Sequence, residues 1–233
     1  MQITSPYSYQ PLPRVTSPSI GRLYQTPNGN LPSVTTILST TSVTPELDAW
    51  REAVGEKKAN RVRDEAAGLG TLLHEHLENH ILGRARPGGN NIVRILAKNM
   101  SDLIISGGLT KITDVWGIEA PLYHPSGYAG TADLIASYNG SMAIIDFKTT
   151  KKMKSIDTLG DYPLQLAAYA DAHNEMYGTD INSGVIFMVS RDLKFEIFEF
   201  SGELFQQSRI KWWERVVRFY ELLDDSGSKL AKT

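Results

Sequence analysis

The spacing of hydrophobic positions changes along this chain and divides it into blocks. Residues 46–106 have the pattern of helices separated by glycine- and proline-rich breaks. Residues 114–149 consist of short β-rich runs between turn residues, which predicts three consecutive strands. A crossover helix, a pair of strands and a long amphipathic helix follow. This order of elements predicts one α/β domain.

Caps, turn residues and breakers give the individual elements. The predicted helices are 46–62, 65–82, 92–106, a helix from Asp161 (as its cap) to 174 or beyond, and 203–223, with a further capped helix beginning within 32–38. The predicted strands are 114–123, 128–138, 141–149, 185–189 and 194–200, with a small hairpin at 22–30. We expect an extended or disordered arm at 1–20, a single domain at 21–225 and a flexible tail at 226–233.

Two aspartates flank the tightest predicted turn. Asn139-Gly140 between β-rich runs is the strongest short-range hairpin signal and indicates a type I′ turn. Continuing the register from that turn places Asp133 directly opposite Asp146. The next pair on the same face is Thr131 with Lys148.

This pairing predicts a site for a cation and an anion. Like charges facing each other destabilise a sheet by about 0.2–1 kcal/mol unless something binds between them. The neighbouring Ile144 and Ile145 favour a buried strand, where an unpaired charge is costly. A hard divalent cation such as Mg²⁺ would convert the repulsion of Asp133 and Asp146 into coordination. Lys148 adds a positive charge suited to a phosphate.

Two further groups of residues support this hypothesis less specifically. Gln165 and Tyr169 are four residues apart and therefore share one face of the crossover helix, although such a helix is also typical of ordinary core packing. Lys151 and Lys152 follow the aspartates closely and offer contacts to a phosphate backbone, although a lysine run is usually a solvated loop.

Histidines suggest an alternative metal site. His74-Glu75 does not begin an HExxH zinc motif, because Glu78 stands where the second histidine is required. His76 and His80 have helical i,i+4 spacing, which leaves a zinc hydrolase as an alternative, although we expect them to lie on a solvated helix face.

Composition narrows the functional class. The 233 residues are 41% hydrophobic, carry a formal charge of −2 and include no cysteine. The absence of cysteine excludes disulfides, thiolate zinc sites and iron–sulfur clusters. The charge argues against a basic nucleic-acid coat, so DNA contacts must come from local patches. No hydrophobic run approaches the roughly 18 residues of a membrane span, and no targeting segment is seen, so we expect a cytoplasmic protein without membrane partners.

The motifs together resemble the RecB-type branch of the PD-(D/E)XK nuclease superfamily. They are Gly70…His74, Gly130-Thr131-Ala132-Asp133, Asp146-Phe147-Lys148 and Gln165…Tyr169, in this order. The chain is similar in particular to the mitochondrial genome maintenance exonuclease family, through the segments 31–38, 74–78, 128–130 and 163–165. The resemblance covers about residues 22–220. Because no mitochondrial targeting segment precedes the motifs, we expect a phage or bacterial member, in the host cytoplasm if phage-encoded.

The resemblance implies a fold and a site. The fold is a restriction-endonuclease-like α/β core, with a central mixed sheet flanked by helices and an N-terminal helical arch. The implied ligands of Mg²⁺ or Mn²⁺ are His74, Asp133, Asp146 and the carbonyl of Phe147. Lys148 would orient the attacking water or stabilise developing charge, and DNA would be contacted by Gln165, Tyr169, Lys151 and Lys152.

The implied activity is hydrolysis of single-stranded DNA from free ends, in replication, recombination or repair, with replication or recombination proteins as partners. The strand would thread through the arch, for which the charges of Lys57, Lys58, Arg61 and Arg63 are candidates. The alternatives are an exonuclease that starts at duplex ends and supplies single strands to a recombinase, and a catalytically inactive DNA-binding module.

Overall fold

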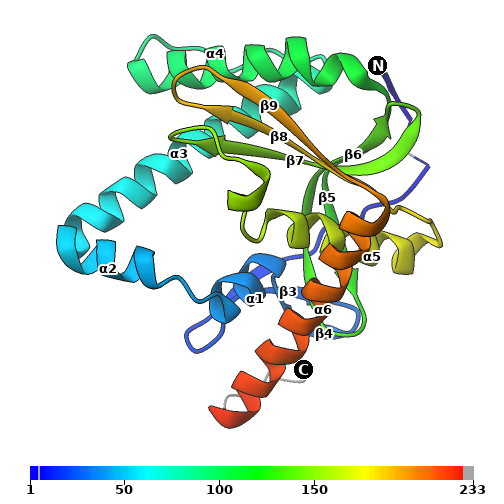
Figure 1. Ribbon diagram of the computed structural model, residues 1–233. Coiled ribbons are helices and arrows are strands. Elements are labelled where there is room, and N and C mark those ends of the chain that lie inside the picture. Colours follow the sequence, from blue (N-terminus) through cyan, green and yellow to red (C-terminus); the bar gives the residue numbers. More distant parts are fainter. Residues whose placement is uncertain (5, 228–233) are drawn as a thin grey trace.

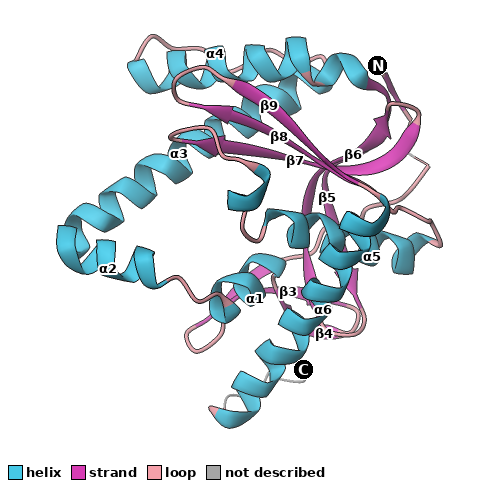
Figure 2. Ribbon diagram, in the orientation of Figure 1, coloured by secondary structure: helices cyan, strands magenta, loops and turns pink. Residues whose placement is uncertain are grey.

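A mixed sheet forms the centre of the molecule, and helices cover both of its faces (Figure 1; Figure 2). The computed structural model describes residues 1–4 and 6–227, and within them this sheet has six strands in the order β1-β5-β6-β7-β8-β9. Strand β1 is parallel to β5 and β7 is parallel to β8, whereas the other neighbours are antiparallel. The predicted α/β fold with a mixed central sheet is confirmed.

The bounds of the described elements follow the predicted order. The strands of the central sheet are β1 Gln2–Ile3, β5 Ile112–His124, β6 Tyr128–Tyr138, β7 Ser141–Thr150, β8 Gly184–Ser190 and β9 Phe195–Phe200. A smaller sheet contains β2 Arg14–Ser17, β3 Gly21–Thr26 and β4 Gly29–Pro32. The helices are α1 Val34–Thr41, α2 Pro45–Val54, α3 Glu56–Ile81, α4 Ile92–Gly107, α5 Tyr162–Tyr177 and α6 Gly202–Asp225, with 3₁₀ turns at Leu109–Lys111 and Ile156–Thr158.

Each face of the sheet has its own hydrophobic core. Helices α3 and α4 pack on one face, where Leu73 and Met100 are buried against Ile145 of β7. Helices α1, α5 and α6 cover the other face, where Trp212 belongs to the same cluster as Ile144. Strands β7 and β8 are therefore buried on both sides, which explains their continuous apolar runs. None of the described helices combines the length and the hydropathy that a membrane span requires.

Two helix boundaries differ from the prediction. The break after α2 lies at Gly55, not between residues 62 and 65, and α3 continues through the predicted gap. Gly55 has φ = 81°, a backbone conformation that glycine adopts without steric cost. Charged residues at 63–65 favour a helix and give no comparable reason to stop.

Asp161 precedes α5 as predicted, but its side chain does not cap the helix. Its Oδ2 instead accepts hydrogen bonds from Arg215 Nη2 and Ser42 Oγ, both at 2.6 Å. Arg215 also donates to the carbonyl of Thr41 at 2.6 Å. The carboxylate therefore ties the end of α1 and the start of α5 to α6.

The β6–β7 register is the predicted one, but the ladder ends before the aspartates. Paired residues run from Tyr138–Ser141 to Leu134–Ile145, and no pair follows. The expected pairs Asp133–Asp146 and Thr131–Lys148 are therefore not part of the described ladder, whereas Thr131 pairs with Pro121 of β5 on the other edge of β6. Two carboxylates facing each other repel, and the strands separate where that repulsion would begin.

The N-terminal arm is extended and packs on the body of the protein. It supplies strands β1 and β2, and the rings of Tyr7 and Tyr9 contact His173 and Tyr177 of α5. Of the tail predicted at 226–233, residues 228–233 lie outside the described part of the chain.

His173 is fully buried under this arm and held in its neutral form. Thr179 Oγ1 donates to Asn174 Oδ1 at 2.8 Å, so it accepts from His173 Nδ1, also at 2.8 Å. Nε2 is then left to accept from the hydroxyl of Tyr9 at 3.0 Å. Burial lowers the pKa of His173 from 6.5 to about 4.

We predict that His173 makes the protein sensitive to mild acid. Below about pH 6.5 His173 of the unfolded chain binds a proton, whereas His173 of the folded chain stays neutral down to about pH 4. The free energy of unfolding therefore falls progressively as the pH drops towards 4. Urea unfolding of the wild type and of His173→Gln, measured from pH 7 to pH 4, should show a shallower decline for the variant. Parallel declines would show that His173 does not carry this sensitivity.

Candidate active site

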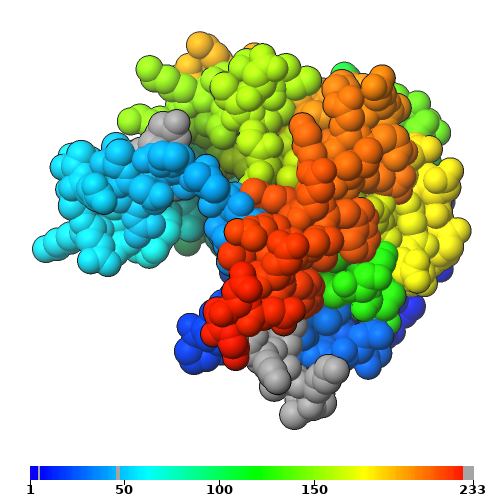
Figure 3. Space-filling model, turned by 60° about the horizontal axis from the view of Figure 1, so that its bottom comes forward, coloured from blue at the N-terminus to red at the C-terminus, as the bar shows by residue number. Residues whose placement is uncertain are grey.

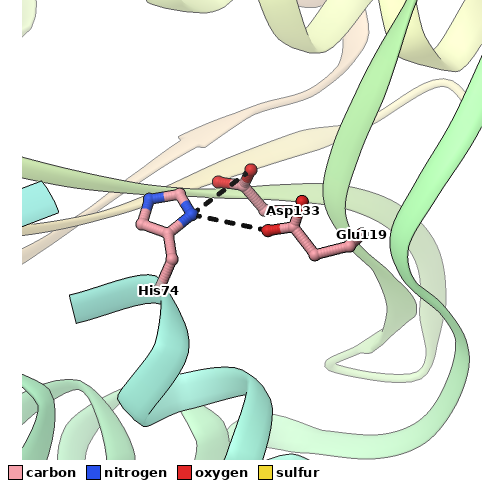
Figure 4. A group of neighbouring side chains, drawn as sticks. All are labelled: His74, Glu119 and Asp133. Atoms are coloured by element: carbon pink, nitrogen blue, oxygen red, sulfur yellow. Dashed lines mark ion pairs between the residues drawn. The ribbon is translucent and has the colours of Figure 1, made fainter. Parts of the chain in front are cut away.

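Three side chains from three elements converge beside the open end of the β6–β7 ladder. His74 of α3 points towards Asp133 of β6 and Glu119 of β5 (Figure 4). Its Nδ1 lies 3.6 Å from Asp133 Oδ1 and 3.7 Å from Glu119 Oε1. Among the described residues, these three form the group whose potential ligand atoms all lie within 4.8 Å of one another.

Glu119 is the member of this group that our sequence reasoning missed. The β5–β6 ladder pairs Ile118 with Leu134 and Ala120 with Ala132, which places Glu119 across from Asp133. Applying the register argument to this hairpin, as to the next one, would have found it. Glu119 also has φ = 46°, which is uncommon for a residue other than glycine outside a turn and is one of the backbone features that cluster at active sites.

Asp146 and Lys148 form a second, more buried part of the site. The Asp146 side chain is 2% exposed and the Lys148 side chain 18% exposed, and Lys148 Nζ lies 2.5 Å from Asp146 Oδ2. Oδ2 of Asp146 therefore has Lys148 as its partner, whereas Oδ1 has none among the described residues. Buried carboxylate oxygens normally have a partner, so Oδ1 has unused capacity to bind a cation.

The backbone of Phe147 connects the two parts. Its N–H donates to Asp133 Oδ2 at 2.9 Å, and its carbonyl oxygen lies 3.0 Å from His74 Nε2. The separation of the strands therefore lets Asp133 take a backbone donor of β7. His74 has an acceptor on either side of its ring, which favours its protonated form.

The pKa values of three side chains in the site are shifted by burial and by the charges close to them. Burial disfavours the charge of His74, but the negative charges of Asp133, Glu119 and Asp146 outweigh it and raise its pKa to about 9. Burial raises the pKa of Asp146 above its ordinary value, against the opposing effect of Lys148. Burial likewise opposes the charge of Lys148, but the two aspartates raise its pKa.

Gln165 and Tyr169 extend the site along α5. Lys148 Nζ donates to Gln165 Oε1 at 3.1 Å, and Gln165 Nε2 donates to Tyr169 Oη at 3.2 Å. Tyr169 is 4% exposed and packs over Gly130, where a Cβ atom would lie 2.7 Å from Tyr169 Cε1. The glycine is thus required by the close approach of this ring.

The remaining predicted residues lie apart from this cluster. Lys151 and Lys152 are exposed in the segment after β7. The proposed arch residues lie in the first half of α3, where Arg61 pairs with Glu65 and Arg63 with Asp64. Because these pairs neutralise both arginines, the free positive charge of that segment comes from Lys57 and Lys58.

The expected solvated face with two histidines is wrong for His76. His76 is 1% exposed, and its Nδ1 accepts from Arg86 Nε at 3.3 Å, whereas His80 is exposed. Burial lowers the pKa of His76, with a further contribution from Arg86. The clustered potential ligands in the described chain include neither histidine, so the structure gives the zinc alternative no support.

The donor set fits a divalent metal ion. Carboxylate and carbonyl oxygens suit hard cations such as Mg²⁺ and Mn²⁺, and an imidazole favours Mn²⁺ of the two. Oδ1 of Asp146 has no partner among the described residues, and a metal ion in place of the proton of His74 would join His74, Glu119 and Asp133. The residues that would hold such an ion come from α3, β5, β6 and β7.

Comparison with known proteins gives a consistent result. The sequence matches the family model of the PD-(D/E)XK nuclease superfamily over residues 113–219. It is similar to mitochondrial genome maintenance exonuclease 1 from human (26% identity, 90% of this chain and 64% of that protein) and from Xenopus tropicalis (29%, 71% and 50%). The mouse protein is 30% identical, over 70% of this chain and 51% of its own length. The chain thus spans about half to two thirds of these relatives.

A solved structure supports the fold alone. The crystal structure of a putative exonuclease from Eubacterium rectale superimposes with a TM-score of 0.50 and 14% sequence identity. The match covers 71% of this chain and 69% of that one. The fold is therefore shared, over about seven tenths of each chain, with a protein of distant sequence.

We predict that Glu119 contributes to metal affinity. A metal present at 100 times its Kd should stabilise the wild type by about 2.7 kcal/mol. Glu119→Gln removes one charged ligand, so we expect the affinity for the metal to fall at least about tenfold. Stabilisation by the same metal concentration should then be smaller by about 1.4 kcal/mol than in the wild type. Thermal unfolding during titration with Mg²⁺ or Mn²⁺ measures this stabilisation. Glu75, an exposed carboxylate on α3, lines a cavity together with His74 and Glu119. Glu75→Gln is therefore the matched control, and equal losses of affinity in both variants would contradict the assignment.

We also predict that Gly130→Ala destabilises the fold through Tyr169. The added methyl group would overlap the ring, and such overpacking costs about 1–3 kcal/mol. Urea unfolding should show a much smaller cost in a Tyr169→Leu background, where the ring is absent. The same cost in both backgrounds would mean that the glycine is needed for another reason.

Proposed function

Because the sequence matches the family model of the PD-(D/E)XK nuclease superfamily and is similar to mitochondrial genome maintenance exonuclease 1, we propose that it is a metal-dependent deoxyribonuclease of that superfamily. We propose further that it hydrolyses phosphodiester bonds from the free ends of single-stranded DNA. The metal ion is Mg²⁺ or Mn²⁺, held by His74, Asp133, Asp146 and the carbonyl of Phe147, with Glu119 as an additional carboxylate.

The observation that carries this proposal is the state of Asp146. Both oxygens of this carboxylate are buried, Oδ2 is paired with Lys148, and Oδ1 has no partner among the described residues. Lys148 and a protonated His74 offset two negative charges, but Asp133, Asp146 and Glu119 bring three. A site with this excess of carboxylates, in which a metal ion can replace the proton of His74, is suited to a divalent cation and a phosphate.

Each residue then has a defined task. A bound divalent ion lowers the pKa of a coordinated water and polarises the scissile phosphate. Lys148, fixed by Asp146 and Gln165, orients the attacking water or stabilises the charge that develops on the phosphate. Gln165 and Tyr169 position the DNA strand beside the cleaved bond. Lys151 and Lys152, which are exposed after β7, contact the backbone of the DNA strand as it leaves the site.

The preference for single strands and free ends rests on α2 and the start of α3. This segment protrudes from the side of the molecule (blue to cyan in Figure 3) and carries the exposed Lys57 and Lys58. A protruding helical pair is compatible with an arch that admits a strand by its end and excludes a duplex. Such an activity serves DNA replication, recombination or repair, together with proteins of those processes.

We predict that Lys148→Met strongly reduces the rate of cleavage. Losing one preorganised stabilising group typically reduces kcat by about 10²–10³-fold. The assay uses linear single strands, circular single strands and blunt duplex, end-labelled where linear, with Mg²⁺ or Mn²⁺. We expect loss of the linear single strand alone. Lys194→Met, an exposed lysine that pairs with Asp192 in the β8–β9 turn, should be fully active.

Other outcomes have distinct meanings. Cleavage of the circle would contradict the requirement for an end, and a preference for blunt duplex would identify the duplex-end exonuclease. No cleavage of any substrate with either metal would refute the proposed nuclease and favour the DNA-binding module.

A further inference from the structure

An arginine from the N-terminal sheet reaches the edge of the candidate active site. Arg14 of β2 donates from Nη2 to Thr131 Oγ1 at 3.2 Å, and Thr131 precedes Asp133 by two residues on β6. Alternation along a strand places Thr131 and Asp133 on the same face, about 7 Å apart. Arg14 therefore lies one short step along the sheet from the carboxylate next to His74.

The guanidinium is positioned by neutral contacts and keeps its charge available. It lies over the ring of Tyr24, 5.5 Å from the centroid, and the hydroxyl of Tyr24 is 3.2 Å from Thr131 Oγ1. No carboxylate of the described residues forms an ion pair with Arg14, in contrast to Arg86, Arg209 and Arg215. A planar, oriented and uncompensated guanidinium is a typical phosphate-binding group.

Its surroundings point to the same ligand. Arg14 lines an open cavity of about 570 Å³ together with His74, Glu75, Glu78 and Glu119. Three carboxylates at one opening would repel a polyanion. A nucleic-acid strand that enters this cavity therefore needs a positively charged side chain at its rim.

The wall formed by α3 admits close approach of a ligand. Ala67, Gly70 and Thr71 line the same cavity with small side chains. A Cβ atom on Gly70 would meet only Thr149 Oγ1, at 3.9 Å, so packing within the described chain does not require a glycine there. Glycine weakens a helix by about 0.5–1 kcal/mol relative to alanine, and close approach of a ligand to the backbone is one reason to tolerate that cost.

We infer that Arg14 binds a phosphate of the nucleic-acid strand next to the scissile one, in the cavity between β2 and α3. This inference rests on the proposed nuclease function and adds a residue from outside its family motifs. Arg14 would bind the strand equally before and during cleavage, which makes it a substrate-binding residue and not a catalytic one.

The test is a phosphate map. Binding of a labelled single strand is measured with Mg²⁺ in a Lys148→Met background, which keeps the metal ligands and strongly reduces cleavage. Single methylphosphonate substitutions neutralise one phosphate at a time. We expect Arg14→Gln to weaken binding of the native strand about tenfold, as for loss of one charge-assisted contact. We also expect it to make the negative slope of log K against log salt concentration shallower by about 0.7.

The position of the effect is the decisive readout. Neutralising one particular phosphate should weaken binding about tenfold in the parent, which is the Lys148→Met protein with Arg14 intact. The same neutralisation should have little further effect on binding to Arg14→Gln. Arg22→Gln, an exposed arginine on β3 of the same small sheet, should retain the parent's map. Where Arg14→Gln also lowers the melting temperature, Arg14→Lys keeps the charge without the planar fork and should show a smaller loss at the same phosphate.

Two results would overturn the inference. One is an Arg14→Gln affinity and map equal to those of the parent. The other is an equal loss in Arg14→Gln and Arg22→Gln at every phosphate, which would indicate a general electrostatic effect. In the chain with Lys148 intact, Arg14→Gln should raise KM and leave kcat unchanged. Absence of cleavage by the unaltered chain would refute the proposed function, whereas the phosphate map reports on Arg14 separately.

Discussion

The burial of Asp146 next to a second carboxylate is the constraint on which the site depends. Strands β6 and β7 pair regularly as far as Leu134–Ile145, and then the ladder ends. Beyond that point Asp133 accepts the N–H of Phe147, and Asp146 pairs with Lys148 through Oδ2 while its Oδ1 has no partner in the described chain. Both faces of β7 are covered by hydrophobic cores, so water cannot solvate this carboxylate and its charge must be matched locally.

The surrounding elements each contribute one group to the site around this carboxylate. Helix α3 brings His74 against the carboxylates, and α5 brings Gln165 to the Lys148 that pairs with Asp146. Strand β5 adds Glu119 in a strained conformation. The small N-terminal sheet adds Arg14 beside Thr131. Elements far apart in the sequence thus meet at the place where two strands separate, and the architecture is built around that separation.

Short-range chemistry made much of this predictable. The Asn139-Gly140 turn fixed the β6–β7 register, and helix spacing placed Gln165 and Tyr169 on one face. The end of the ladder was not predictable, because it follows from repulsion between side chains and from the donor that Phe147 offers. The burial of His76 under Arg86 also depends on tertiary packing, which a periodic pattern does not encode. The break at Gly55 follows from the local backbone freedom of glycine and was therefore within reach of the sequence. Glu119 was within reach of the same register argument.

The central claim is that the carboxylates at the separated strands hold a divalent cation. Anomalous diffraction from a crystal soaked in Mn²⁺ tests it most directly. The account predicts a peak within about 2.0–2.4 Å of oxygens of both Asp133 and Asp146, with an imidazole nitrogen of His74 completing the contacts. A fully soaked crystal with no peak at this position, or with Mn²⁺ bound only at surface carboxylates, would contradict it.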